Sequence, residues 1–146
     1  MDEQQPETLR AVEHEVTVLL RRGRVISWEI ARGVHPDLEP NAYGLLLWLR
    51  RCDSIRLTDL AARLGVGKGT LSRQIQGMEG LGLVRRDPDP TDRRASLLRL
   101  TEEGQHRFDA ARTARLAEFR QKLDNWPERD VTEFAELLRR FNDALG

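Results

Sequence analysis

The fold of this 146-residue chain is decided by one stretch, Asp87-Pro-Asp-Pro-Thr-Asp-Arg-Arg-Ala-Ser-Leu-Leu-Arg-Leu-Thr-Glu-Glu-Gly104. The apolar pair Leu83-Val84 comes just before it, and the alternating run Leu98-Arg-Leu100 lies inside it. Both patterns are typical of short β-strands. Prolines and aspartates, followed by paired arginines, form the loop between the two strands. We therefore predict a basic β-hairpin.

A helix–turn–helix pattern lies directly upstream of this hairpin. Its first helix is short, with Thr58 as the expected N-cap and Gly65 at its end. Its second helix is expected from Lys68 to about Leu81. The buried face of this second helix is indicated by apolar residues spaced four and three apart, namely Leu71, Ile75 and Met78.

The opposite face of the second helix carries no acidic residue, which suits contact with DNA. Arginine suits guanine or phosphate, glutamine suits adenine, and hydroxyl groups suit phosphate or base edges. Near Gly69, free backbone N–H groups at the helix start could meet a phosphate. At 100° per residue the face consists of Gly69, Arg73, Gln76 and Gly80, with Thr70, Ser72 and Gly77 on its flanks.

Two helices are expected before this region. The first runs from Glu7 to Arg32 and the second from Pro40 to Leu49, while Ile55-Arg-Leu57 fits a very short strand or a turn. The first helix carries apolar or small residues at spacings of three and four, namely Leu9, Val12, Val16, Leu19, Gly23, Ile26 and Ile30.

Two further helices are expected after the hairpin. Thr101 caps the first, which runs to about Leu123, and acidic residues in its first turn match the helix dipole. The second begins near Glu128 and carries an apolar stripe of Val131, Phe134, Leu138, Phe141 and Leu145. So small a domain does not obviously bury the stripes at both ends of the chain. We therefore expect a homodimer formed by these ends, with an intramolecular bundle as the alternative.

Charge is distributed unevenly along a chain whose net charge is zero. Residues 56–101 contain nine Lys/Arg and five Asp/Glu, a net charge of +4, whereas residues 1–55 and 102–146 each carry −2. A local basic patch, rather than the total charge, is the electrostatic sign of nucleic-acid binding.

Several classes of protein are disfavoured by the sequence. No apolar run could cross a bilayer, and Met1–Pro6 is polar and acidic, unlike a signal peptide, so we expect a cytoplasmic protein with no membrane partner. The single cysteine, Cys52, excludes an internal disulfide framework. The histidines at positions 14, 35 and 106 lack the spacing of metal ligands. No nucleophile–base pair, carboxylate pair or phosphate-binding loop is present, so we expect neither an enzyme nor a cofactor.

The sequence resembles the MarR family of bacterial winged-helix transcription regulators over nearly its whole length. The motifs that carry the resemblance are Leu60-Ala-Ala-Arg-Leu64, Gly69-Thr-Leu-Ser-Arg73, Met78-Glu-Gly-Leu-Gly-Leu-Val84, Asp89-Pro-Thr-Asp-Arg-Arg94 and Leu98-Arg-Leu-Thr-Glu-Glu-Gly104. The resemblance implies a mainly α-helical single domain, 1–146, with a small β-hairpin wing. Residues 40–101 would form the winged helix-turn-helix, and residues 7–35 and 102–146 the dimerisation helices.

The family pattern also implies roles for individual residues. Thr70, Ser72 and Arg73 match recognition-helix residues that contact the major groove and backbone, and Arg94 matches the arginine that enters the minor groove. Asp92 matches an acid that braces the wing through ionic contacts. The remaining candidates for DNA contact are Lys68, Gly69, Gln76, Arg85, Arg86 and Arg93, with Arg85 and Arg86 alternatively a solvated strand end.

Many relatives release DNA when a small, often aromatic and anionic compound binds between the dimerisation helices and the winged helix. The residues that could line such a pocket here are Trp28, His35, Tyr43 and Trp48, with ordinary core packing as the alternative. The resemblance thus implies a homodimeric repressor that binds double-stranded DNA at a pseudo-palindromic operator and leaves it when an effector binds. A winged helix for protein interaction, without specific DNA binding, and a redox-sensing regulator that uses Cys52 are the alternatives.

Overall fold

The computed structural model describes residues 7–146; Met1–Pro6, whose polar sequence is unlike a signal peptide, lies outside the described residues. The chain divides into two compact units, the first ending at Ala111 and the second spanning Arg112–Gly146.

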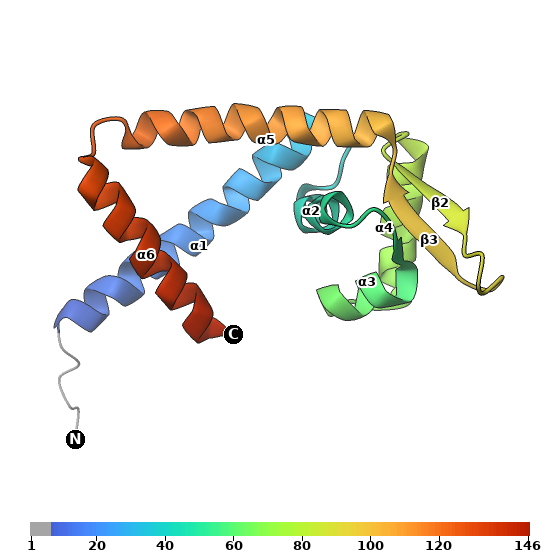
Figure 1. The fold of residues 1–146 in the computed structure, drawn as a ribbon, viewed down its shortest axis with the longest axis horizontal. Coiled ribbons are helices and arrows are strands. Elements are labelled where there is room, and N and C mark those ends of the chain that lie inside the picture. The colour runs from blue at the N-terminus through green and yellow to red at the C-terminus, as the bar shows by residue number, and fades with distance from the viewer. Residues whose placement is uncertain (1–6) are drawn as a thin grey trace, which may run out of the picture. The chain divides into compact units, whose positions relative to one another are not determined.

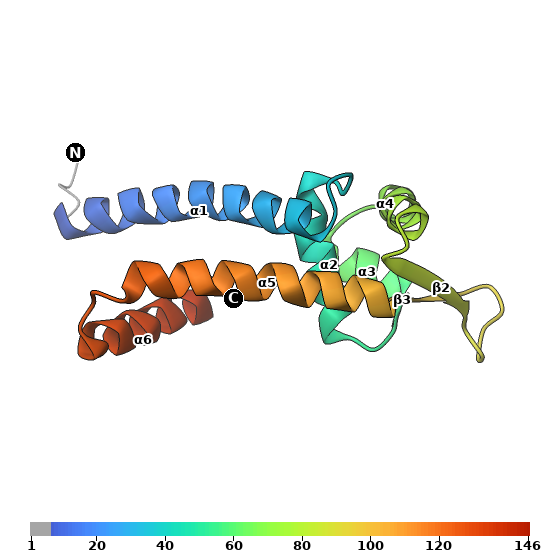
Figure 2. The same ribbon diagram turned by 90° about the horizontal axis from the view of Figure 1, so that it is seen from above.

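Helices make up most of the first unit (Figures 1 and 2). Helix α1 spans Glu7–Val34, and a 3-10 turn, η1, spans Pro40–Ala42 before α2 at Tyr43–Arg51. The expected helix from Pro40 therefore begins as a 3-10 turn, where proline needs no donor. The helix–turn–helix follows as α3, Leu57–Leu64, and α4, Lys68–Gly80, and α5 begins at Glu102.

A three-stranded antiparallel sheet accompanies these helices, in the order β1-β3-β2. Strand β1 is Ile55–Arg56, β2 is Val84–Pro88 and β3 is Ser96–Leu100. Val84 pairs with Leu100 and Pro88 with Ser96, so β2 and β3 form the hairpin predicted from the sequence. In both views the loop of this hairpin lies at the opposite end of the unit from the N-terminal half of α1 (Figures 1 and 2).

One apolar core holds the first unit together. Leu46 of α2, Leu60 of α3, Leu71 and Ile75 of α4 and Phe108 of α5 are all fully buried in it. The predicted buried face of α4 is therefore confirmed. Because this face is fixed in the core, the opposite face of α4 is held towards solvent.

The expected cap at Thr58 is wrong. Helix α3 begins one residue earlier, at Leu57, and Arg56 occupies the N-cap without a side-chain capping bond. The reason is that Ile55 and Arg56 pair with Leu98 and Leu97 of β3 as extended chain. The helix starts as soon as this pairing ends, which places Thr58 inside its first turn.

The predicted cap at Thr101 is confirmed, and it joins three elements. The Gly104 amide donates to Oγ1 of Thr101 at 3.0 Å, which caps α5. The Thr101 hydroxyl donates to the carbonyl of Gly82 at 2.6 Å, and its amide donates to the carbonyl of Leu83 at 2.9 Å. Gly104 packs against that same Leu83 carbonyl, where a β-carbon would collide with backbone.

The second unit contains the rest of α5, which ends at Leu123, and α6, Glu128–Leu145. The rings of Trp126 and Phe134 pack 5.9 Å apart. No residue of α6 is buried, and its apolar side chains Phe134, Leu137, Phe141 and Leu145 are all exposed. Within residues 7–146, no helix combines the length and apolar character that a membrane span requires.

Replacing Gly104 with alanine should destabilise the fold by roughly 1–3 kcal/mol, because the added methyl group overlaps backbone that cannot move freely. Gly77→Ala in α4 is the matched control, since a β-carbon there meets no atom within 4 Å and should stabilise the helix by up to about 1 kcal/mol. Urea unfolding followed by circular dichroism measures both changes. Equal stability of the two variants would contradict the packing described for Gly104.

Candidate nucleic-acid interface

The exposed face of α4 carries most of the candidate residues predicted on this helix. Leu71 and Ile75 are fully buried, so the face of α4 opposite to them is turned towards solvent. Ser72 is half-buried. The other candidates on this helix are exposed, namely Lys68, Gly69, Thr70, Arg73 and Gln76. This face therefore offers two cations, an amide and a hydroxyl group to a partner.

The N-terminal end of α4 is open. Gly67 occupies the N-cap and has no side chain to bond the first amide groups of the helix. Orphan N–H groups at a helix start, together with the helix dipole, favour a phosphate or another anion. Lys68 and Gly69 lie in this first turn.

The loop between β2 and β3 carries Arg93 and Arg94, both of them exposed. Its backbone is held by local hydrogen bonds. The Asp89 amide donates to the Ala95 carbonyl at 3.2 Å, and the Ala95 amide donates to the Asp92 carbonyl at 3.0 Å. Two arginine side chains are thus presented on a defined turn.

The base of this loop is fixed by Asp89, which is only 5% exposed. Its carboxylate accepts bonds from the amide and the hydroxyl of Thr91, at 2.9 and 2.7 Å, and pairs with Nε of Arg56 at 2.7 Å. The Thr91 hydrogen bonds, aided by the Arg56 charge, hold the pKa of the Asp89 carboxyl below its usual value.

Sequence reasoning missed Asp89 and assigned the ionic brace of the wing to Asp92. The Asp92 carboxylate instead accepts a turn hydrogen bond from the Arg94 amide at 3.0 Å. It forms no ion pair within residues 7–146. A signal for Asp89 was present, because an aspartate in a turn commonly accepts a hydrogen bond from the backbone amide two residues later, as in an Asx turn.

The two arginines of β2 face opposite sides of the sheet. Arg86 lies on the side of α4, where its Nε donates to Glu79 at 2.6 Å and its Nη2 donates to the Ser72 carbonyl at 3.1 Å. It also donates to the Ser72 hydroxyl at 3.3 Å. Arg86 therefore ties the wing to α4, and its guanidinium is already engaged within the protein.

Arg85 lies on the outer side of the sheet, directly opposite Arg99. Both guanidinium groups pair with Asp87, at 3.3 and 3.4 Å. Exposed pairs of this kind are weak, so Arg85 keeps the freedom to contact another anion.

The four aromatic and histidine candidates for an effector pocket do not gather in one place. Trp28 and Tyr43 line the same open groove, of about 800 Å³, together with Arg24. Trp48 instead stacks with Arg63 at 5.2 Å, and Nδ1 of His35 accepts the amide of Asp37 at 3.0 Å. The groove lining includes neither His35 nor Trp48.

Cys52 lies half-buried just after α2. Its amide caps that helix by donating to the carbonyl of Trp48 at 3.1 Å. In the part of the chain that the structure describes, no cluster of histidine, cysteine and acidic side chains could hold a metal ion.

Comparison with known proteins gives this arrangement a context. The model of the MarR family matches residues 37–95, the segment that contains the helix–turn–helix and most of the wing. Over 145 residues the chain is 33% identical to the HTH-type transcriptional regulator YxaD of Bacillus subtilis, itself uncharacterized, with 99% of each chain covered.

Two solved structures share the fold. The structure of RV1404 from Mycobacterium tuberculosis superposes with a TM-score of 0.82 at 23% identity, covering 100% of this chain and 98% of the other. Streptococcus pneumoniae FabT, solved in complex with DNA, gives a TM-score of 0.79 at 18% identity, with 94% and 96% covered.

Replacing Asp89 with asparagine should destabilise the wing at neutral pH, because it removes the charge that pairs with Arg56. A lowered pKa means that this stabilisation is present above the usual aspartate value of about 3.9, and is lost as the pH falls through the folded-state value. Urea unfolding at pH 7 should therefore separate the variant from the parent, and the gap should close towards pH 3. Asp124→Asn is the control, and a pH-independent gap for Asp89→Asn would contradict the assignment.

Proposed function

Because the chain belongs to the MarR family of winged-helix transcriptional regulators, we propose that it is a homodimeric repressor that binds a pseudo-palindromic DNA operator. The observation that carries the proposal is that one unit presents two basic surfaces. The exposed face of α4 presents Lys68 and Arg73, and the wing loop presents Arg93 and Arg94. We also propose a cytoplasmic location, because the relatives named above are bacterial and bacterial DNA lies in the cytoplasm.

In the proposed complex α4 enters the major groove. Arg73 reads guanine or contacts phosphate, Gln76 contacts adenine, and the open first turn around Gly69 meets the backbone. The wing loop lies over the adjacent minor groove with Arg94 inserted, since a narrow minor groove attracts arginine. The FabT structure, whose fold this chain shares, contains DNA and supports this use of the fold.

A dimer with two-fold symmetry would double these contacts. Each unit has an exposed apolar surface through which such a dimer could form. In the first unit, α1 exposes Leu9, Val12, Leu19, Leu20 and Trp28. In the second, α5 and α6 expose Phe119, Leu137, Phe141 and Leu145. Exposed apolar surface of this kind marks protein interfaces. A symmetric dimer then sets two half-sites about one helical turn apart, roughly 34–36 Å.

We propose that a small effector controls release from DNA. The groove of Trp28 and Tyr43 supports an aromatic or anionic compound, because Arg24 is the one charged residue in its lining. A winged helix for protein interaction is the rival function. It differs in one measurable respect, since it gives no preference for any DNA sequence over random duplex.

Selection of bound duplexes from a random library should yield a pseudo-palindrome, which then serves as the operator in binding assays. Arg73→Ala should weaken operator binding about 10- to 100-fold and relax base preference at one position in each half-site. Arg94→Ala should weaken binding mainly at operators with a narrow minor groove. Electrophoretic mobility shift or fluorescence anisotropy measures these changes.

Arg129→Ala in α6 is the control for these variants, because this exposed arginine lies outside the proposed surface. Affinity of the parent protein should fall about 10³-fold or more between 50 and 200 mM salt if six or more phosphates are neutralised. Parent-like binding by both Arg73→Ala and Arg94→Ala would refute the docking geometry. Failure to enrich any sequence would favour the protein-interaction rival.

Introducing a charge at Leu137 should weaken the dimer, because this side chain is 52% exposed in the single chain and contributes little to its own core. We expect Leu137→Glu to raise the dimer dissociation constant at least about tenfold, as seen by analytical ultracentrifugation. Arg139→Glu, a larger charge change on the side of α6 opposite Leu137, is the control, because residues two apart on a helix point in nearly opposite directions. A dimer equally sensitive to both variants would not use the apolar face of α6.

A further inference from the structure

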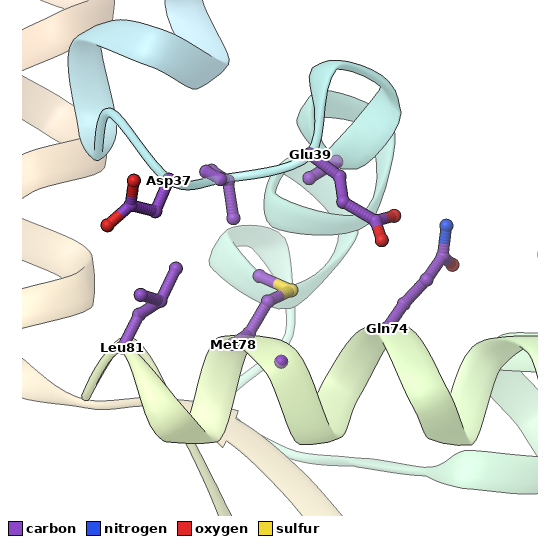
Figure 3. A pocket seen from close by; sticks show the side chains of 8 residues that line it. Asp37, Glu39, Gln74, Met78 and Leu81 are labelled. Carbon is purple, nitrogen blue, oxygen red and sulfur yellow. The ribbon is translucent and has the colours of Figure 1, made fainter.

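A small cavity lies between α4 and the segment that joins α1 to α2 (Figure 3). Met78 lies at the centre of its α4 wall, with Gln74 on one side and Leu81 on the other. Asp37 lies across from Leu81, and Glu39 extends its carboxylate towards Gln74 (Figure 3). The cavity volume is about 160 Å³, and a cavity of about 150 Å³ is enough to hold benzene.

The charge of this cavity is negative. Its lining contains Asp37 and Glu39 but no lysine, arginine or histidine. Neither carboxylate has an ion-pair partner among residues 7–146, and both are exposed at the rim. Gly77 and Met78 of the α4 wall lie in the last turn of this helix, where the helix dipole is negative. All of these features favour a cation and disfavour an anion.

The deeper part of the cavity is apolar. Leu38, Ala42 and Met78 are each at least 95% buried, and Leu81 adds a half-buried side chain. The thioether of methionine adapts its shape and packs well against an aromatic ring. An apolar floor below a negative rim suits a molecule with one apolar body and one positive group.

We propose that this cavity binds a small organic ammonium ion. Its apolar body, no larger than about one ring, packs against Met78 and Leu38, and its ammonium group lies beside Glu39 or Asp37. The cavity shares no lining residue with the groove of Trp28 and Tyr43, and its charge preference is the opposite.

Occupation of the cavity acts directly on α4, because Met78 and Gln74 belong to the helix that carries Arg73. A ligand that contacts this helix changes DNA affinity if the helix positions differ between free and bound protein, and DNA changes ligand affinity by the same factor. This regulatory part rests on the proposed function, whereas binding of the ammonium ion does not.

The binding test uses the full chain without DNA and three probes of similar size. Isothermal titration calorimetry at pH 7 compares 2-phenylethylammonium with neutral 2-phenylethanol and anionic 3-phenylpropionate. We expect the ammonium probe to bind at least about tenfold more tightly than the alcohol, as charge-assisted hydrogen bonds do. Equal affinity for the alcohol, or tighter binding of the carboxylate in this cavity, overturns the proposal.

Variants identify where the probe binds. The double variant Asp37→Asn and Glu39→Gln should lose about tenfold or more in ammonium affinity, whereas Asp53→Asn, an exposed carboxylate elsewhere, should leave it unchanged. Gly77→Leu should fill the cavity and abolish binding, because Gly77 lines it and a β-carbon there meets no atom within 4 Å.

Gly80→Leu, on the same helix but outside the lining, is the matched control for Gly77→Leu. Thermal unfolding establishes that both leucine variants fold. Binding that survives in Gly77→Leu and in the double variant overturns the proposed location.

The regulatory test measures the affinity of the parent protein for the selected operator with and without saturating 2-phenylethylammonium. We expect a change of about fivefold or more, which the double variant Asp37→Asn and Glu39→Gln should remove while Asp53→Asn retains it. An unchanged operator affinity in the presence of bound probe overturns the regulatory part. If the protein binds no operator at all, the proposed function fails, and the calorimetry still decides whether the ammonium site exists.

Discussion

The hydrogen bonds of Thr101 are the constraint on which the rest of the first unit depends. They join the turn after α4 to the end of β3 and to the start of α5, through the carbonyls of Gly82 and Leu83. Because Gly104 brings α5 against the Leu83 carbonyl, the hairpin leaves α4 at a position set by backbone groups. The exposed arginines Arg73, Arg93 and Arg94 are thus carried by this frame, and the hydrogen bonds of Thr101 that hold it do not involve their side chains.

Much of this frame could be predicted from the sequence, because its signals are local. The spacing of Leu71, Ile75 and Met78 defines one buried face of α4, and the structure buries all three. A threonine followed by two glutamates is a local capping signal, and Thr101 caps α5 as expected. The paired strands were recognisable because alternating apolar residues flank a loop rich in proline and aspartate.

Other features could not be predicted because they depend on contacts between distant residues. Helix α3 starts before Thr58 because β1 pairs with β3, which lies some forty residues later in the chain. The alternation of side chains along β2 places Arg85 and Arg86 on opposite faces of the sheet. It does not reveal that Arg86 forms hydrogen bonds with Glu79 and Ser72 of α4. Asp89 was within reach of local reasoning, whereas its partner Arg56 was not. Which exposed residues contact DNA stays a prediction, because base recognition depends on the partner's groove as well as on this chain.

The prefolded wing loop has a consequence for the entropy of DNA binding. Turn hydrogen bonds at Asp89, Asp92 and Ala95 already fix its backbone in the free protein. Ordering a flexible loop would oppose binding by about 1–2 kcal/mol for each residue, whereas immobilising an arginine side chain opposes it by at most about 2 kcal/mol. Docking of this wing therefore restricts mainly the side chains of Arg93 and Arg94. Most of the attraction between those guanidinium groups and DNA is then retained as affinity.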